Sequence, residues 1–70
     1  MKLSARNQLA GTVSEVKEGI VTAEIVVKLD GGQEIVSVIT VESARNLGLQ
    51  PGVRVAAIIK STEVLLATEI

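Results

Sequence analysis

The side chains best suited to binding chemistry are hydroxyls and cations that stand close together in the sequence. A small tetrahedral dianion needs converging donors: one or two cations, hydroxyls and backbone N–H groups, with carboxylates kept away. Three pairs of residues supply such donors: Ser4 and Arg6, Thr40 and Ser43, and Lys60 and Ser61. An oxyanion site is therefore one interpretation of these positions.

Each pair also has an ordinary structural explanation. Thr40 precedes a predicted helix and is expected to cap it, Ser43 fits an exposed first-turn serine, and Lys60 fits a solvated strand end. Helix starts attract anions in general, because their free N–H groups and positive dipole end point outward. Taken singly, none of these residues establishes an anion site.

Catalytic groups are scarce in this chain. It contains no His, Cys or Tyr, so the commonest nucleophiles and general bases are missing. The acidic residues fall mostly on solvent-side positions or turns, and no spacing points to a carboxylate pair acting as acid and base. No glycine-rich phosphate loop joins a strand to a helix. We therefore predict a protein that is not an enzyme.

The composition also argues against several kinds of partner. Without Cys or His the chain lacks the preferred ligands of transition metals, so no cation site is expected. Seven basic and eight acidic residues are spread along the chain, and aromatic residues are absent, which argues against nucleic acid. Apolar runs of about five residues fall far short of the roughly twenty that span a membrane. Since the N-terminus also lacks a secretory signal, we expect a cytoplasmic protein.

The length of the chain favours self-association. We expect residues 1–70 to form one domain, and so small a core rarely supplies more than about 3–5 kcal/mol without a disulfide, a metal or association. Disulfides are excluded by the lack of Cys, while 47% of the residues are hydrophobic. Contact between copies of the chain is the remaining source of stability. The alternative, a monomer with an apolar surface, stays open.

The elements that would position the donors are mainly strands. Apolar and polar residues alternate with a period of two, which is typical of half-buried strands. Strands are predicted over residues 5–15, 21–29, 34–40, 53–60 and 64–67. The single predicted helix covers residues 41–47, with Thr40 as its N-cap and Gly48 as its stop. Turns are predicted at residues 17–19, 30–32, 51–52 and 61–62.

This order predicts an all-β fold, a five-stranded OB-like barrel with one short helix between strands 3 and 4. The third strand is apolar on both faces, because Ile35 and Ile39 alternate with Val36 and Val38. In a lone barrel one of these faces would meet water, which again favours a partner chain.

The tetrapeptide Ser-Ala-Arg-Asn occurs twice, at residues 4–7 and 43–46. The first copy leads into a strand and the second lies on the predicted helix, so the two cannot present the same side-chain geometry. We interpret the repeat as coincidence, and Arg45 receives no role.

Three segments together resemble the molbindin family, the molybdate-binding Mop domains of TOBE or OB-like type. They are SARNQL at residues 4–9 followed by Gly11, the segment from Ile39-Thr40 to Leu47-Gly48-Leu49, and IKSTEV at residues 59–64. The resemblance covers essentially the whole chain, with matching order and spacing.

The resemblance implies a homohexamer, built as a trimer of dimers, with molybdate or its close analogue tungstate bound at subunit interfaces and no organic cofactor. The implied ligands are Ser4, Arg6, Lys60 and Ser61 of one subunit with Thr40 and Ser43 of a neighbour. A second class of site, on threefold axes, would use the hairpin at Gly19, Ile20 and Thr22, which offers backbone N–H groups.

Two functions remain open at this point. A chain of 70 residues leaves no room for a DNA-binding or ATPase domain, so intracellular storage and homeostasis of molybdate is expected rather than regulation or transport. The alternative is a non-catalytic oligomerisation or docking module without a specific anion ligand. Titration with the anion separates the two, because a docking module would release no heat.

Overall fold

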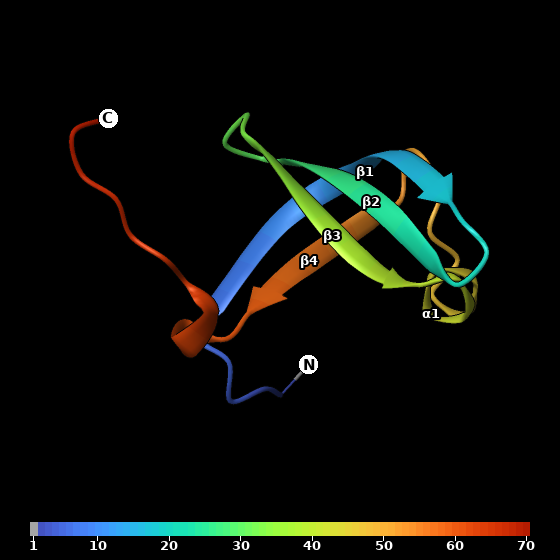
Figure 1. Cartoon of the computed structure of the whole chain (residues 1–70), viewed down its shortest axis with the longest axis horizontal. Helices are drawn as coiled ribbons and strands as arrows, with labels where there is room; N and C mark the ends of the chain where they lie inside the picture. The colour runs from blue at the N-terminus through green and yellow to red at the C-terminus, as the bar shows by residue number, and fades with distance from the viewer. Residues whose placement is uncertain (1) are drawn as a thin grey trace.

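The computed structural model describes residues 2–70 and shows a single curled sheet with a short helix at one end (Figure 1). Within these residues the elements are β1 (Asn7–Glu18), β2 (Thr22–Leu29), β3 (Glu34–Thr40), α1 (Val41–Asn46), β4 (Arg54–Ile59) and the 3-10 helix η1 (Ser61–Glu63). All neighbouring strands are antiparallel, in the order β3-β2-β1-β4. The sheet forms an OB-like half-barrel that stays open between β3 and β4.

β1 is the central strand, because it pairs with β4 along its first half and with β2 along its second. Gly11 lies where the two ladders overlap. A Cβ added there would stand 2.6 Å from the carbonyl oxygen of Lys28 and 2.8 Å from Cγ1 of Val27. Only glycine permits so close an approach, so this residue allows the sheet to curl.

A β-bulge interrupts the pairing of β1 with β2 between Val13 and Glu15. The extra residue is Ser14, whose hydroxyl donates to the carbonyl oxygen of Val26 over 3.2 Å. A bulge bends its strand and shifts the alternation of inward and outward side chains by one residue. Val16, three residues after the buried Val13, therefore faces inward again. The strand predicted over residues 5–15 therefore runs over residues 7–18 instead, because the bulge lets the pairing with β2 continue, and Lys17 and Glu18, which were predicted as a turn, belong to β1.

The core is small and aliphatic. Its buried residues are Val13, Ala23, Ile25, Val27, Val41 and Ala44. Ala23, Ile25 and Val27 of β2 are buried at alternate positions, as the alternation predicted, Leu29 is half-buried, and α1 adds its inward face. β3 has its predicted bounds, β2 begins one residue later than predicted, β4 is one residue shorter at each end, and α1 is one residue shorter at its C-terminal end.

The predicted fifth strand, at residues 64–67, is wrong for this structure. After β4 the chain turns through η1, where the N–H of Glu63 donates to the carbonyl oxygen of Lys60 over 2.9 Å. Residues 64–70 then run away from the sheet (Figure 1). The alternation of residues 64–67 suits a strand, but a strand also needs a neighbouring strand that pairs with its backbone groups. Here η1 directs the segment away from the outer edges of both β3 and β4. The described sheet therefore has four strands.

The outer face of β3 carries apolar side chains, as predicted. Val36 and Val38 are exposed, while Ile35 and Ile39 are half-buried on the inner face. Both faces of this strand are thus apolar and only one of them is covered within the described chain.

Candidate anion-binding site

Four of the predicted ligands meet where the β1–β4 ladder ends. Asn7 pairs with Ile59 at the last step of this ladder. Nδ2 of Asn7 also donates to the carbonyl oxygen of Ile59 over 3.2 Å, which fixes this end of the sheet. Arg6 lies in a bend just before β1 and Lys60 follows β4 directly, so both cations flank the same end of the ladder.

Neither cation has an acidic partner among residues 2–70. The ion pairs found there are Lys17–Glu15, Arg45–Glu18 and Arg54–Asp30. Arg6 and Lys60 take part in none of these pairs, and both are exposed. Like charges on opposite positions of a sheet repel each other. An anion bound between these two residues would offset that repulsion.

Two hydroxyls flank the cations. Ser4 lies in a bend just before Arg6, and Ser61 opens η1 just after Lys60. Both serines are exposed, and neither hydroxyl belongs to the side-chain hydrogen bonds of residues 2–70. The donors gathered at this end are therefore a guanidinium, an ammonium and two hydroxyls.

The remaining two predicted ligands lie together at the start of α1. Thr40 is the N-cap, as predicted: its Oγ1 accepts from the N–H of Ser43 over 3.0 Å. The hydroxyls of Thr40 and Ser43 also share a hydrogen bond of 2.8 Å. One hydroxyl proton bridges the pair and the other stays available, so this exposed pair can still donate one O–H to a ligand.

The two groups of ligands lie at opposite ends of the molecule (Figure 1). Arg6 precedes β1, a strand of 12 residues, whereas Thr40 pairs with Thr22 beyond the far end of that strand. Figure 1 shows the N-terminal segment and η1 at one end and α1 at the other. A tetrahedral oxyanion is far smaller than this separation. One chain therefore cannot place both groups on the same anion.

The hairpin predicted as a second site has one of its donors already engaged. The N–H of Gly19 donates to the carbonyl oxygen of Thr22 over 2.8 Å, which closes the turn between β1 and β2. Ile20, at the tip, is 99% exposed. Gly19 itself therefore offers no further N–H to an anion.

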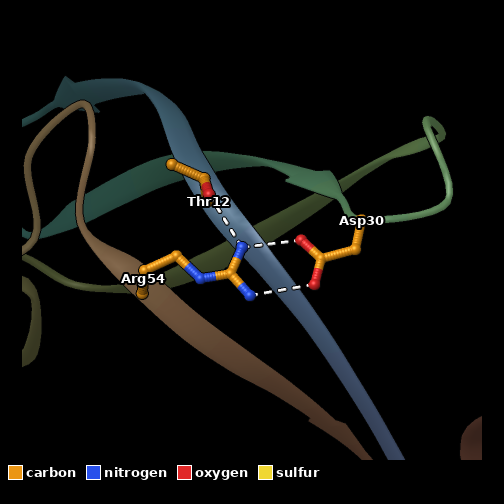
Figure 2. Close-up of polar contacts among 3 residues, drawn as sticks. All are labelled: Thr12, Asp30 and Arg54. Carbon is orange, nitrogen blue, oxygen red and sulfur yellow. Dashed lines mark hydrogen bonds and ion pairs between the residues drawn. The ribbon is translucent and has the colours of Figure 1, made fainter.

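The sequence reasoning missed a clamp between three elements (Figure 2). Arg54 of β4 donates from Nη1 and Nη2 to the two carboxylate oxygens of Asp30, over 2.6 and 2.9 Å, and from Nη1 to Oγ1 of Thr12 over 3.0 Å. The hydrogen bond to Arg54 lowers the pKa of the Asp30 carboxyl below its usual range, and the same bond raises the pKa of Arg54. This contact depends on the pairing register of β1 with β4, which places Thr12 opposite Arg54. The alternation of apolar and polar residues in the sequence does not reveal that register.

In the part of the chain that the structure describes, no three His, Cys, Asp or Glu side chains gather where they could hold a metal ion. Within residues 2–70, no helix has the length and apolar character needed to cross a membrane.

A curled antiparallel sheet with one short helix is an OB-like fold, a class that hosts many ligands. The sequence matches the TOBE domain family over residues 3–66. It is also 47% identical to molybdenum-pterin-binding protein 3 of Clostridium pasteurianum over 66 residues, which cover 94% of this chain and 97% of that protein. The chain therefore belongs to the TOBE domain family and, within it, to the molybdenum-pterin-binding (Mop) proteins, the molbindin family that its sequence resembles.

Solved structures agree with this assignment. The molybdate-binding protein from Sporomusa ovata matches with a TM-score of 0.91 at 43% identity, covering 97% of this chain and all of that one. The cytoplasmic molybdate-binding protein ModG, with molybdate bound, matches with a TM-score of 0.84 at 48% identity. That match covers 87% of this chain but only 43% of ModG.

Proposed function

We propose that this chain, as a single Mop domain over residues 1–70, binds molybdate in the cytoplasm and stores it without acting as an enzyme. The observation that carries the proposal is that Arg6 and Lys60 flank the same end of the β1–β4 ladder and have no acidic partner among residues 2–70. The names of the relatives supply the identity of the anion. Tungstate, a tetrahedral dianion of nearly the same size, is expected to bind at the same place.

The chemistry of the site favours the oxyanion over a pterin, although relatives are named for molybdenum-pterin. A planar pterin ring would be held best by stacking on an aromatic side chain, and the sequence contains no Phe, Trp or Tyr. A guanidinium, an ammonium and hydroxyls instead suit charged oxygen atoms. In this proposal the ligand is the oxyanion alone, with no organic cofactor and no cation.

A second copy of the chain completes the site. Ser4, Arg6, Lys60 and Ser61 come from one subunit, and Thr40 and Ser43 come from a neighbour. The separation of these groups within one chain supports this arrangement (Figure 1). The family resemblance extends it to a homohexamer, a trimer of dimers, with a second class of site at the hairpin of Gly19, Ile20 and Thr22. Because the N–H of Gly19 is bonded within the turn, the donors there would come from Ile20 and Thr22.

Calorimetric titration tests the proposal. Molybdate should give saturable heat, tungstate should compete with it, and chloride at equal ionic strength should give none, because a specific site differs from general charge screening. A chain that assembles but releases no heat with molybdate would support the alternative, an oligomerisation or docking module.

A further inference from the structure

Two carboxamide side chains, those of Asn7 and Gln8, directly follow the cation Arg6 at the start of β1. Nδ2 of Asn7 donates to the carbonyl oxygen of Ile59 over 3.2 Å, a contact between residues 52 positions apart in the sequence. Nε2 of Gln8 donates to the carbonyl oxygen of Ala5 over 3.1 Å. Neither amide is one of the candidate ligands, so contact with the anion explains neither hydrogen bond.

Each of these carbonyl groups belongs to the peptide unit that leads into a candidate cation. The carbonyl group of Ala5 shares a planar peptide unit with the N–H of Arg6. In the same way, the carbonyl group of Ile59 shares one with the N–H of Lys60. Because a peptide unit is rigid, holding its oxygen also fixes the direction in which the next Cα leaves it. The two amides therefore hold the peptide planes from which the two cationic residues extend.

The paired part of the sheet ends just short of both cations. β1 begins at Asn7 and β4 ends at Ile59, and these two residues form the last pair of the ladder. On the far side of Lys60, the N–H of Glu63 donates to the carbonyl oxygen of Lys60 over 2.9 Å. Lys60 is thus held on both sides, through the preceding peptide unit by Asn7 and through its own carbonyl group by η1.

An amide suits this task better than a carboxylate. A carboxamide carries two N–H donors, whereas an ionised carboxylate can only accept. An acidic residue at position 7 or 8 could not bond to a carbonyl oxygen and would add negative charge where an anion must approach. Asn7 is half-buried and Gln8 is exposed, so water competes less for the hydrogen bond of Asn7.

We propose that Asn7 and Gln8 are positioning residues that hold Lys60 and Arg6 in place before molybdate binds. Asn7 acts on Lys60 across the end of the ladder, and Gln8 acts on Arg6 within the bend that precedes β1. A site held in this way does not have to order its own backbone when the anion arrives, and that ordering would otherwise weaken binding. The inference rests on the proposed function and deepens it.

Backbone NMR relaxation of the full-length, anion-free protein tests the positioning, because it reports the mobility of each N–H group separately. In the parent, the N–H groups of Arg6 and Lys60 should be as ordered as those of β1 and β4. Asn7→Ala should raise the mobility of Lys60 more than that of Arg6, and Gln8→Ala should do the reverse. Saturation with molybdate should order both residues again. Variants that raise the mobility of both residues alike, or of neither, would overturn the proposal.

Calorimetric titration of the same proteins measures the consequence for binding. Asn7→Ala should weaken molybdate binding roughly five- to thirtyfold, which corresponds to ordering the backbone of one residue on binding, and Gln8→Ala should weaken it less. Parental affinity in both variants would overturn the proposal.

Asn46→Ala is the matched control. Asn46 ends the second Ser-Ala-Arg-Asn segment, is exposed, and forms none of the side-chain hydrogen bonds found within residues 2–70. Its replacement should leave both the affinity and the mobility of Arg6 and Lys60 as in the parent. A loss equal to that of Asn7→Ala would contradict a specific role for Asn7.

The two measurements separate this inference from the proposed function. N–H mobility is measured without molybdate, so it decides whether the amides hold the two cations whatever the titration gives. A parent chain that releases no heat with molybdate would contradict the proposed function alone. Gln8 is exposed and its hydrogen bond spans only three positions, so Gln8→Ala should fold and decides the question if Asn7→Ala does not.

Discussion

The arginines of this chain differ in their partners. Arg45 and Arg54 each have a carboxylate partner, Glu18 and Asp30. Arg6 belongs to no ion pair among residues 2–70, and neither does Lys60 at the same end of the β1–β4 ladder. The partners, rather than the residue type, distinguish a structural cation from one available to a ligand.

Removing Arg6 or Lys60 should weaken molybdate binding strongly. Arg6→Ala or Lys60→Ala leaves the dianion less compensated, and loss of one partner from a buried charged contact typically costs about 2–5 kcal/mol. That corresponds to a loss of at least roughly thirtyfold in affinity, measured by calorimetric titration. Each variant must first show the oligomeric state of the parent, so that lost binding does not simply report lost assembly.

Arg45→Ala is the matched control for these variants. It removes the same type of side chain from the second Ser-Ala-Arg-Asn segment, but this guanidinium bonds to Glu18 over 3.0 Å at an exposed position. Exposed ion pairs contribute little to stability, so both folding and molybdate affinity should stay close to those of the parent. Equal losses for Arg45→Ala and Arg6→Ala would mean that overall charge, rather than this cluster, attracts the anion.

Ser43 provides a test of the second group of ligands. Ser43→Ala removes a hydroxyl but keeps the N–H that Thr40 caps, so the helix should persist. The loss of one neutral donor should weaken molybdate binding by about 1–3 kcal/mol, measured by the same titration. Thr40→Ala would be harder to interpret, since losing the N-cap itself costs about 0.5–2 kcal/mol of stability. Unchanged affinity in Ser43→Ala would remove this residue from the site.

At the scale of elements, β1 organises the molecule because both of its ladders pass Gly11. Gly11→Ala places a Cβ against backbone atoms of β2 and should destabilise the fold by about 1–3 kcal/mol, the usual range for overpacking. Gly31→Ala is the control, because nothing lies within 4 Å of its added Cβ, and its effect should stay within about 0.5 kcal/mol. Urea unfolding measures both, and similar midpoints for the two variants would contradict this account of the curled sheet.

The clamp of Figure 2 predicts a pH dependence of stability. Because Arg54 lowers the pKa of Asp30 in the folded chain, the ion pair stabilises the fold above the unfolded-state pKa and loses this effect as the pH falls through the folded-state pKa. This pair is exposed but bidentate, so Asp30→Asn should lower the melting temperature slightly at neutral pH, and the difference from the parent should disappear in acid. Arg54→Gln should behave alike. A difference that persists unchanged to the acid end would show that the charge of Asp30 is not its cause.

Local patterns predicted most elements but not their pairing. Alternation located β2, β3 and β4, and Thr40 with Gly48 located the ends of the helix to within a residue. The bulge at Ser14 and the clamp at Arg54 depend on strand register, which one sequence does not reveal. The fifth strand was mispredicted for a related reason, because residues 64–67 have the right composition but no ladder partner among residues 2–70.

At the scale of the whole molecule, the chain is incomplete in three ways. Within residues 2–70 the core contains six buried residues, the half-barrel is open between β3 and β4, and the two groups of candidate ligands lie too far apart to share an anion. A single event, the assembly of several copies, would remedy all three. The residues of the site came from the family resemblance, since their types and spacing alone also fitted ordinary caps and strand ends.

Native mass spectrometry with and without molybdate tests the central claim most directly, because it counts subunits and bound anions in the same particle. The predicted result is an assembly of six times the 7.3 kDa chain, whose mass increases in steps of one molybdate as the anion is added. Arg6→Ala should keep the assembly and lose most of those steps. A 7.3 kDa monomer at micromolar concentration, or an assembly that gains no mass with molybdate, would contradict the claim that this chain binds the anion between its copies.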